Sequence, residues 1–175
     1  MTRAHTAVLG LGANLGDAAE ALRSAARFLK ADSSTDVVAA SQIYRSAAVG
    51  GPEQPDYLNA VVVVETDRRA WELLALANEI EAAHDRVRSE RWGPRTLDID
   101  IITFDAVVSN DPDLTLPHPR ARQRLFVILP WLEIAPLTEH PQLGSLPLLA
   151  VELHEQDVTA TGEPLLDPGS PPSGS

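Results

Sequence analysis

Two aspartates, Asp98 and Asp100, lie two residues apart in a segment, residues 96–104, that is expected to form a strand. Residues two apart on a strand point to the same face and lie about 6.6 Å apart along it. Aspartate is depleted in strands, and two like charges on one face repel each other unless a cation or arginine side chains compensate. Carboxylate oxygens at this spacing could hold one or two Mg²⁺ ions that also bind phosphate oxygens. The alternative is an exposed edge strand whose acids are solvated.

Arginine clusters precede and follow this strand, since residues 86–95 hold four arginines and one acid, and residues 120–124 hold three arginines and no acid. Small arginine clusters suit a compact polyanion such as a nucleoside triphosphate, whereas a nucleic-acid partner needs an extended basic face. Taken singly, either cluster is explained equally well by solvated loop arginines. Phosphoryl-type transfer requires metals that bridge phosphate oxygens and cations that meet the developing charge. Residues 86–100 contain both the cations and the metal-binding carboxylates, namely Arg86, Arg88, Arg91, Arg95, Asp98 and Asp100.

Three other features could serve a ligand site, and each has a structural alternative. His118 stands between two prolines that fix the backbone, although a lone histidine is more often structural or solvated. The glycines of residues 10–16 lack the G-x-G-x-x-G spacing, which favours a tight strand-to-helix turn over direct phosphate binding. Tyr57, Trp92 and Phe126 stand out in a chain that is 5% aromatic, but aromatic residues near strands more often belong to the core.

Composition narrows the function classes. The 175 residues carry 14 Lys and Arg against 25 Asp and Glu, a formal net charge of -11, and 44% of them are hydrophobic. Cysteine is absent, which excludes disulfides, thiolate zinc sites and cysteine nucleophiles, and which fits a reducing cytoplasm. Lys30 is the only lysine, which disfavours lysine-based phosphate loops and Schiff-base chemistry. The apolar stretch 125–132 is shorter than the roughly 20 residues that span a bilayer, so we expect a soluble, cytoplasmic protein without a membrane or targeting segment.

Hydrophobic periodicity predicts the elements that must position these residues. An apolar run at 6–12 predicts a buried strand, and Asp17 with Glu20 forms a capping-box signature for a helix that ends near Lys30. The β-branched run within residues 57–65 is typical of a central strand. The remaining expected elements are strands at 36–44, 96–104 and 114–116, a loop at 46–55, a helix at 69–86, an apolar element at 126–129 and helix interrupted by prolines at 133–153.

The order strand, helix, strand, strand, helix, strand predicts an α+β fold. We expect a ferredoxin-like α/β sandwich, with a mainly antiparallel sheet and its helices packed on one sheet face. The length suits one domain, which we place at residues 1–155. Residues 156–175 contain four Pro, three Gly and three Ser, and they are expected to form a disordered acidic tail.

Four motifs follow one another along the chain. They are Gly12-Ala13-Asn14-Leu15-Gly16, QPDYLNA at residues 54–60, RWGPRTLDID at residues 91–100 and LPHPR at residues 116–120. Together they resemble the signatures of the 2-amino-4-hydroxy-6-hydroxymethyldihydropteridine pyrophosphokinases, the HPPK family of folate biosynthesis. The third motif is the most specific, and the resemblance extends over residues 8–136. The sequence departs from the family pattern at Ala13, at residues 46–49 and at Ser89.

The resemblance implies Mg²⁺-dependent transfer of pyrophosphate from ATP to 6-hydroxymethyl-7,8-dihydropterin, which gives AMP and the pterin diphosphate. It implies that Asp98 and Asp100 bind two Mg²⁺ ions. It also implies that Arg86 and Arg95 stabilise charge in the transition state. Loops 46–55 and 86–95 would act as lids that exclude water, and the enzyme is expected to be a monomer.

The same resemblance implies two further groups of site residues. The residues implied at the pterin are Val49, Tyr57, Asn59 and Phe126. Within that group, Tyr57 and Phe126 would sandwich the pterin ring while Asn59 hydrogen-bonds its edge. The residues implied at the nucleotide are Glu81, Arg88, Trp92, His118 and Arg124.

Two alternatives remain open. The same architecture could be a non-catalytic module that binds RNA or a small regulatory ligand. An RNA-recognition sheet should carry an aromatic-rich pattern, whereas the corresponding strand here has two aspartates that would repel phosphates without a metal, so we expect no nucleic-acid partner. A different Mg²⁺-ATP transferase is distinguished only by testing substrates.

Overall fold

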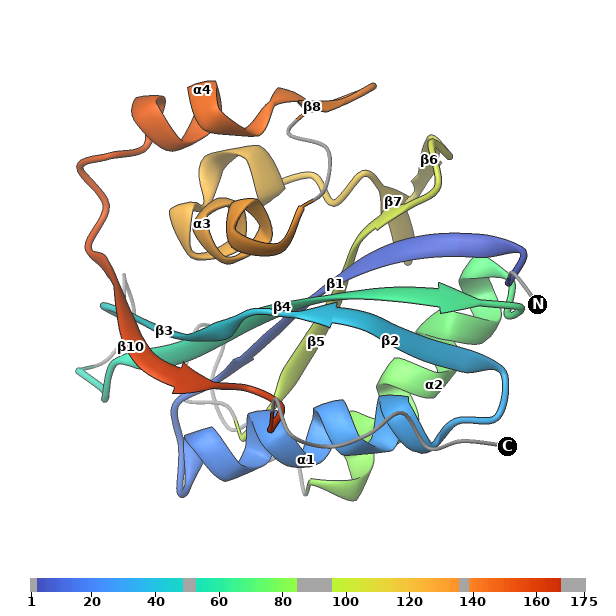
Figure 1. Cartoon of the computed structure of the whole chain (residues 1–175), viewed down its shortest axis with the longest axis horizontal. Coiled ribbons are helices and arrows are strands. Elements are labelled where there is room, and N and C mark those ends of the chain that lie inside the picture. Colours follow the sequence, from blue (N-terminus) through green and yellow to red (C-terminus); the bar gives the residue numbers. More distant parts are fainter. Residues whose placement is uncertain (1–2, 49–52, 85–95, 136–138, 168–175) are drawn as a thin grey trace.

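The computed structural model describes residues 3–48, 53–84, 96–135 and 139–167, and its centre is a six-stranded sheet (Figure 1). The strands of the sheet are β1 (His5–Ala13), β2 (Thr35–Ala40), β3 (Gln42–Ser46), β4 (Tyr57–Thr66), β5 (Asp98–Phe104) and β10 (Val158–Pro164). Their order is β10-β3-β4-β1-β5, with β2 paired to β4, and every pairing is antiparallel. The predicted α+β, ferredoxin-like architecture with a mainly antiparallel sheet is confirmed.

The helices and the small hairpins surround this sheet. The helices are α1 (Ala18–Ala31), α2 (Ala70–Ala83), α3 (Leu125–Ile134), α4 (Leu146–Glu152) and a 3₁₀ turn at Ala121–Gln123. The hairpins are β6 (Ser109–Asp111) with β7 (Leu114–Leu116), and β8 (Glu139–His140) with β9 (Gly144–Ser145). Helix α1 forms where the capping box predicts it, because the Asp17 side chain accepts the backbone N–H of Glu20 at 3.1 Å.

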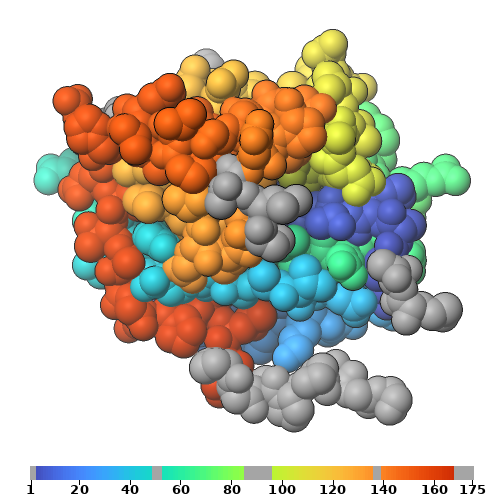
Figure 2. Space-filling model, turned by 45° about the horizontal axis from the view of Figure 1, so that its top comes forward, coloured from blue at the N-terminus to red at the C-terminus, as the bar shows by residue number. Residues whose placement is uncertain are grey.

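Helices cover both faces of the sheet. Helices α1 and α2 pack on one face, against alternate strand residues such as Leu9, Val62 and Ile101. Helix α3 packs on the other face against Val61 and Ile102, and α4 packs on α3. Figure 1 shows the sheet between these two helical layers, and Figure 2 shows the orange α3–α4 layer lying over the strands. The prediction that the helices lie on one sheet face is therefore wrong, because the apolar element expected at 126–129 is a helix of ten residues.

The single strand predicted at 36–44 is divided into β2 and β3 at Ser41. Both strands pair with β4, β2 with residues 62–66 and β3 with residues 57–59. At the break, the Ser41 backbone N–H donates to the Val61 carbonyl at 2.9 Å, and the Ser41 hydroxyl accepts the Val61 N–H at 3.0 Å. The serine side chain thus replaces a backbone acceptor, so the two strands follow one edge of β4.

The expectation of a disordered tail from residue 156 is wrong for residues 158–164. These residues form β10, which pairs with β3 at an edge of the sheet. The Thr161 hydroxyl donates to the Ile43 carbonyl at 2.7 Å, and Leu165 is only 2% exposed in the core beneath α1. Composition misled here because an edge strand accepts Gly162 at a positive φ of 82° and Pro164 at its end.

The segment 133–153, expected to be helix interrupted by prolines, contains more than helix. It holds the end of α3, the β8–β9 hairpin and α4, which begins after Ser145 caps the Leu148 N–H at 3.3 Å. Within the described residues, no helix has the length and apolar character needed to cross a membrane.

Candidate active site

The two aspartates of β5 share the sheet face that α3 covers. Side chains alternate along a strand, and Ile102, two residues beyond Asp100, belongs to the core beneath α3. Ile99 and Ile101 point the other way, into the core beneath α1 and α2. The predicted common orientation of Asp98 and Asp100 is therefore present. The alternative interpretation was an exposed edge strand with solvated acids. Strand β5 is indeed an edge strand, but both aspartates are half-buried.

The pterin residues predicted on β4 lie on the same face. Tyr57, Asn59 and Val61 are spaced two residues apart along β4 and so share one face, and Val61 packs beneath α3. Strand β1 lies between β4 and β5, and Gly12 is paired with Asn59 on one side and with Asp98 on the other. A polar amide and a carboxylate thus stand on either side of a residue that has no side chain.

Glycines of β1 therefore form the floor of the candidate site. A Cβ at Gly12 would lie 3.5 Å from Oδ1 of Asn59, and a Cβ at Gly10 would lie 3.3 Å from Cδ1 of Ile102. The predicted strand-to-helix turn is correct for Gly16, whose φ is 61°, whereas Gly10 and Gly12 lie within β1, in agreement with the strand predicted at 6–12. Absence of a side chain, and not backbone strain, is what these two glycines contribute.

A histidine, His118, and an arginine, Arg124, face Asp100. Nε2 of His118 lies 3.9 Å from Oδ2 of Asp100, and Nη1 of Arg124 lies 4.0 Å from the same oxygen. The His118 backbone N–H donates to the Ile102 carbonyl at 2.8 Å, which ties the residues before α3 to β5. The Arg124 guanidinium lies 5.4 Å from the centre of the Phe126 ring, within the range of a cation–π contact. The structure brings these four predicted residues together.

The surroundings of His118 favour its neutral imidazole. Burial lowers the pKa of its imidazole below 6.5, and the charges of Arg124 and Arg120 act in the same direction, while Asp100 opposes them. Nδ1 accepts the Arg120 backbone N–H at 3.2 Å, so the ring hydrogen is on Nε2, which faces Asp100. Burial also lowers the pKa of Arg124, but a guanidinium remains charged near neutral pH. The site therefore offers one fixed cation and one neutral hydrogen-bond donor.

Glu81 lies on the opposite side of β5. It is 4% exposed on α2, and its carboxylate accepts the Ile99 backbone N–H at 3.2 Å. This bond fixes the start of β5, next to the aspartates. The role of Glu81 toward the nucleotide stays a prediction.

Two asparagines at the site make hydrogen bonds that the sequence did not predict. Nδ2 of Asn59 donates to the Ser46 hydroxyl at 2.7 Å, which fixes the orientation of the amide. Nδ2 of Asn14 donates to Oε1 of Gln54 at 2.9 Å and to the Pro55 carbonyl at 3.0 Å. The first and second sequence motifs therefore meet in space, and their joint presence was the signal that could have predicted the contact.

The sequence model of the family described as 7,8-dihydro-6-hydroxymethylpterin-pyrophosphokinase (HPPK) matches residues 8–136. The chain belongs to the HPPK family. Relatives named 2-amino-4-hydroxy-6-hydroxymethyldihydropteridine pyrophosphokinase share about two-fifths of the aligned residues with this HPPK. The protein of Methylorubrum extorquens is 44% identical over 136 residues, 78% of this chain and 84% of that protein. The protein of Bacillus subtilis is 39% identical over 135 residues, 77% of this chain and 81% of that protein.

Solved structures agree with the fold of this HPPK. The wild-type HPPK-DHPS of Plasmodium falciparum, with pterin and p-hydroxybenzoate, covers 87% of this chain with a TM-score of 0.66 and 16% identity. This chain spans 43% of that longer chain. At such low identity the comparison supports the fold alone.

Five predicted site residues lie outside the described part of this HPPK. They are Val49, Arg86, Arg88, Trp92 and Arg95. Among the described residues, no group of three His, Cys, Asp or Glu side chains is close enough to hold a metal. A pair of carboxylates nevertheless fits Mg²⁺, because this ion is usually bound through one or two carboxylates together with substrate phosphates and water.

Proposed function

We propose that this HPPK catalyses the reaction for which its family is named, with ATP as the pyrophosphate donor and 6-hydroxymethyl-7,8-dihydropterin as the acceptor. The hydroxyl oxygen of the pterin forms a bond to the β-phosphorus and its proton is released to the solvent, while the bond from that phosphorus to the α,β-bridging oxygen breaks. AMP and the pterin diphosphate are the products. The observation that carries the proposal is the row Asn59, Gly12, Asp98 across three adjacent strands, because it places an amide beside a carboxylate pair.

The pterin binds on the β4 side of the Gly12 floor. Asn59 gives its N–H₂ group to Ser46, so its amide oxygen is oriented to accept from the N–H groups of a pterin edge. Tyr57 and Phe126 supply the two aromatic faces of the ring site, and the family resemblance adds Val49 to it. Stacking and hydrogen bonding of this kind orient the hydroxymethyl group before reaction.

The phosphates bind on the β5 side. Asp98 and Asp100 would hold the two Mg²⁺ ions, which would supply positive charge that neutralises the phosphates. Arg124 adds a fixed positive charge next to Asp100, and His118 adds a neutral N–H donor.

Further residues complete the nucleotide side. Arg86 and Arg95 stabilise the charge that develops during transfer, and these roles follow from the family resemblance of their positions. Glu81, Arg88 and Trp92 contact the nucleotide. Positioning and fixed charge suffice for this chemistry, because the pterin hydroxyl is itself the nucleophile.

The test is pterin-dependent formation of AMP. Purified protein is incubated with Mg²⁺, ATP and the dihydropterin, and the nucleotides are separated by chromatography, with controls that lack pterin or contain excess EDTA. Equal amounts of AMP and pterin diphosphate are expected. Formation of ADP would indicate a different kinase, and folded protein without pterin-dependent turnover would favour a regulatory binding module.

The enzyme acts as a monomer, and sedimentation at micromolar concentration tests this. We propose a cytoplasmic location, which the absence of cysteine supports. Neither RNA nor a membrane takes part in the proposed reaction.

A further inference from the structure

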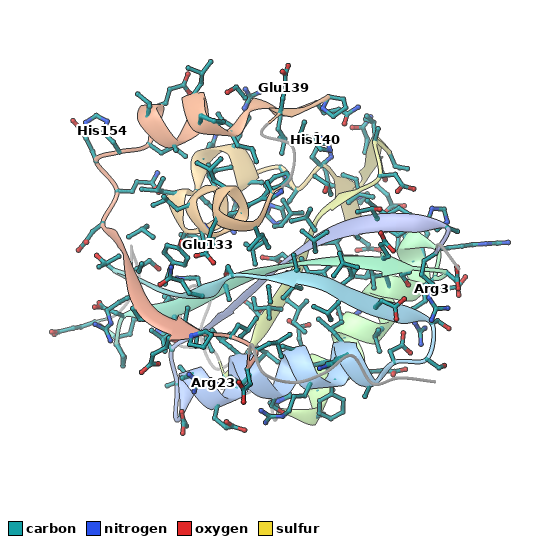
Figure 3. All side chains as sticks on the ribbon, viewed as in Figure 1. Arg3, Arg23, Glu133, Glu139, His140 and His154 are labelled. Atoms are coloured by element: carbon teal, nitrogen blue, oxygen red, sulfur yellow. The ribbon has the colours of Figure 1, made fainter. Side chains whose placement is uncertain are left out.

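Glu133 joins α3 to the sheet at a position remote from the aspartates. Its side chain points from α3 toward the sheet (Figure 3). Its carboxylate accepts three hydrogen bonds: from the Gln42 backbone N–H at 3.0 Å, from the Gln42 side chain at 3.0 Å and from the Tyr44 hydroxyl at 2.7 Å. The side-chain oxygen of Gln42 accepts the Gly162 N–H of β10 at 2.9 Å. We name Gln42, Tyr44 and Glu133 the α3–β3 junction.

The junction joins an exposed carboxylate, that of Glu133, to a buried phenol, that of Tyr44. Tyr44 is only 6% exposed, and its hydroxyl meets a carboxylate at a distance typical of a charge-assisted hydrogen bond. Burial, and next the bond to Glu133, raise the pKa of the Tyr44 phenol far above its usual range. The phenol is therefore protonated near neutral pH and donates to the Glu133 carboxylate. Hydrogen bonds of this class are about twice as strong as those between neutral groups.

Both partners of the junction lead to the pterin side of the site. On β3, Ser46 follows Tyr44 by two residues and so shares its face, and Ser46 accepts the hydrogen bond that orients Asn59. On α3, Phe126 lies in the first turn and Glu133 lies seven residues later, a rise of about 10 Å along the helix. A tilt of α3 at Glu133 would therefore displace the Phe126 ring relative to the Asn59 amide.

We propose that the α3–β3 junction is a positioning device that sets the gap between Asn59 and Phe126, and through that gap the affinity for the pterin. Tyr44 and Glu133 do not contact the reacting atoms, and they act through Ser46 and Phe126. The inference rests on the proposed function, because the proposed function assigns the pterin to the gap between Asn59 and Phe126.

The test compares Tyr44→Phe and Glu133→Gln with a matched control, Thr35→Val. Thr35 shares a buried hydrogen bond of 2.8 Å with the hydroxyl of Thr66, and it lies on β2, away from α3. Tyr44→Phe and Thr35→Val each remove one buried hydroxyl group, so the two variants should have similar general effects on folding. Glu133→Gln keeps one acceptor oxygen and serves as the conservative variant.

Kinetics separate positioning from general destabilisation. In Tyr44→Phe, the KM for the pterin should rise about three- to tenfold, as expected for the loss of one hydrogen bond, while the KM for ATP and kcat stay within about twofold. Glu133→Gln should show a smaller rise. Thr35→Val should leave all three constants unchanged. An unchanged pterin KM in Tyr44→Phe, or an equal rise in Thr35→Val, would overturn the proposal.

Hydrogen exchange tests the same inference without activity. Backbone amides of residues 125–134 should exchange faster in Tyr44→Phe than in the wild type, and at the wild-type rate in Thr35→Val. Equal exchange in all three proteins would show that the junction does not hold α3. If the wild type forms no AMP with the pterin, the proposed function fails, and so does the proposed effect of the junction on pterin affinity. Hydrogen exchange of residues 125–134 would still show whether the junction holds α3 in place.

Discussion

Gly12→Ala should separate stability from substrate binding. Gly12 lies within strand β1, and an added Cβ would lie 3.5 Å from Oδ1 of Asn59 and 3.9 Å from the Leu58 carbonyl, which is ordinary van der Waals contact. The folded state therefore accepts alanine. The lower entropy of the unfolded chain should then raise the free energy of unfolding by about 0.4–1 kcal/mol. For a domain of this size, that change corresponds to a rise in Tm of roughly 1–4 °C.

The same methyl group would project onto the floor between Asn59 and Asp98. Filling a packed site with an extra methyl group costs about 1–3 kcal/mol, so the KM for the pterin should rise roughly 5- to 150-fold. Gly16→Ala is the control: its φ of 61° makes alanine unfavourable by about 1–2 kcal/mol, while its position outside the strand should leave pterin binding unchanged. Calorimetry and AMP formation at varied pterin concentration provide the two measurements. Normal pterin binding by Gly12→Ala would refute the assignment of the floor.

Three further predictions concern charge. Asp98→Asn should abolish AMP formation while the free energy of unfolding changes by no more than about 0.5 kcal/mol, and activity near that of the wild type would contradict metal binding by Asp98. Arg95→Ala should lower kcat by about 10³-fold with a smaller effect on ATP binding, as for an arginine that stabilises a transition state; an unchanged kcat would remove that role. Because burial lowers the pKa of His118, the unfolded chain binds its proton more readily, so the free energy of unfolding should fall as the pH drops below 6.5. Urea titrations between pH 5 and pH 7 should show a shallower decline for His118→Gln, and identical slopes would contradict a lowered pKa.

Local patterns predicted the parts of the fold that depend on neighbouring residues. The common face of Asp98 and Asp100 follows from the period of two along a strand, and the start of α1 follows from the Asp17 cap. Both predictions need only a few consecutive residues, and both are confirmed by the structure. The four family motifs all lie within residues 8–136, the range that the family model matches.

Contacts between distant segments could not be predicted in the same way. The position of Gly12 between Asn59 and Asp98 depends on the register of two strand pairings, which no local pattern contains. The face covered by α3 depends on a helix whose apolar run is too short to be distinguished from a buried strand. The composition of residues 156–175 was typical of disorder, yet Leu165 supplies apolar area to the core.

Strand β10 also determines when the molecule can finish folding during synthesis. It pairs with β3 across a large separation, since Thr161 and Ile43 are 118 residues apart, and such contacts form late because the intervening chain must first be closed into a loop. Until residues 158–164 emerge from the ribosome, β3 presents unpaired backbone groups at the sheet edge. An open edge of this kind pairs readily with the same strand of another chain. A chain shortened at residue 155 would thus gain a surface for aggregation as well as losing its last strand.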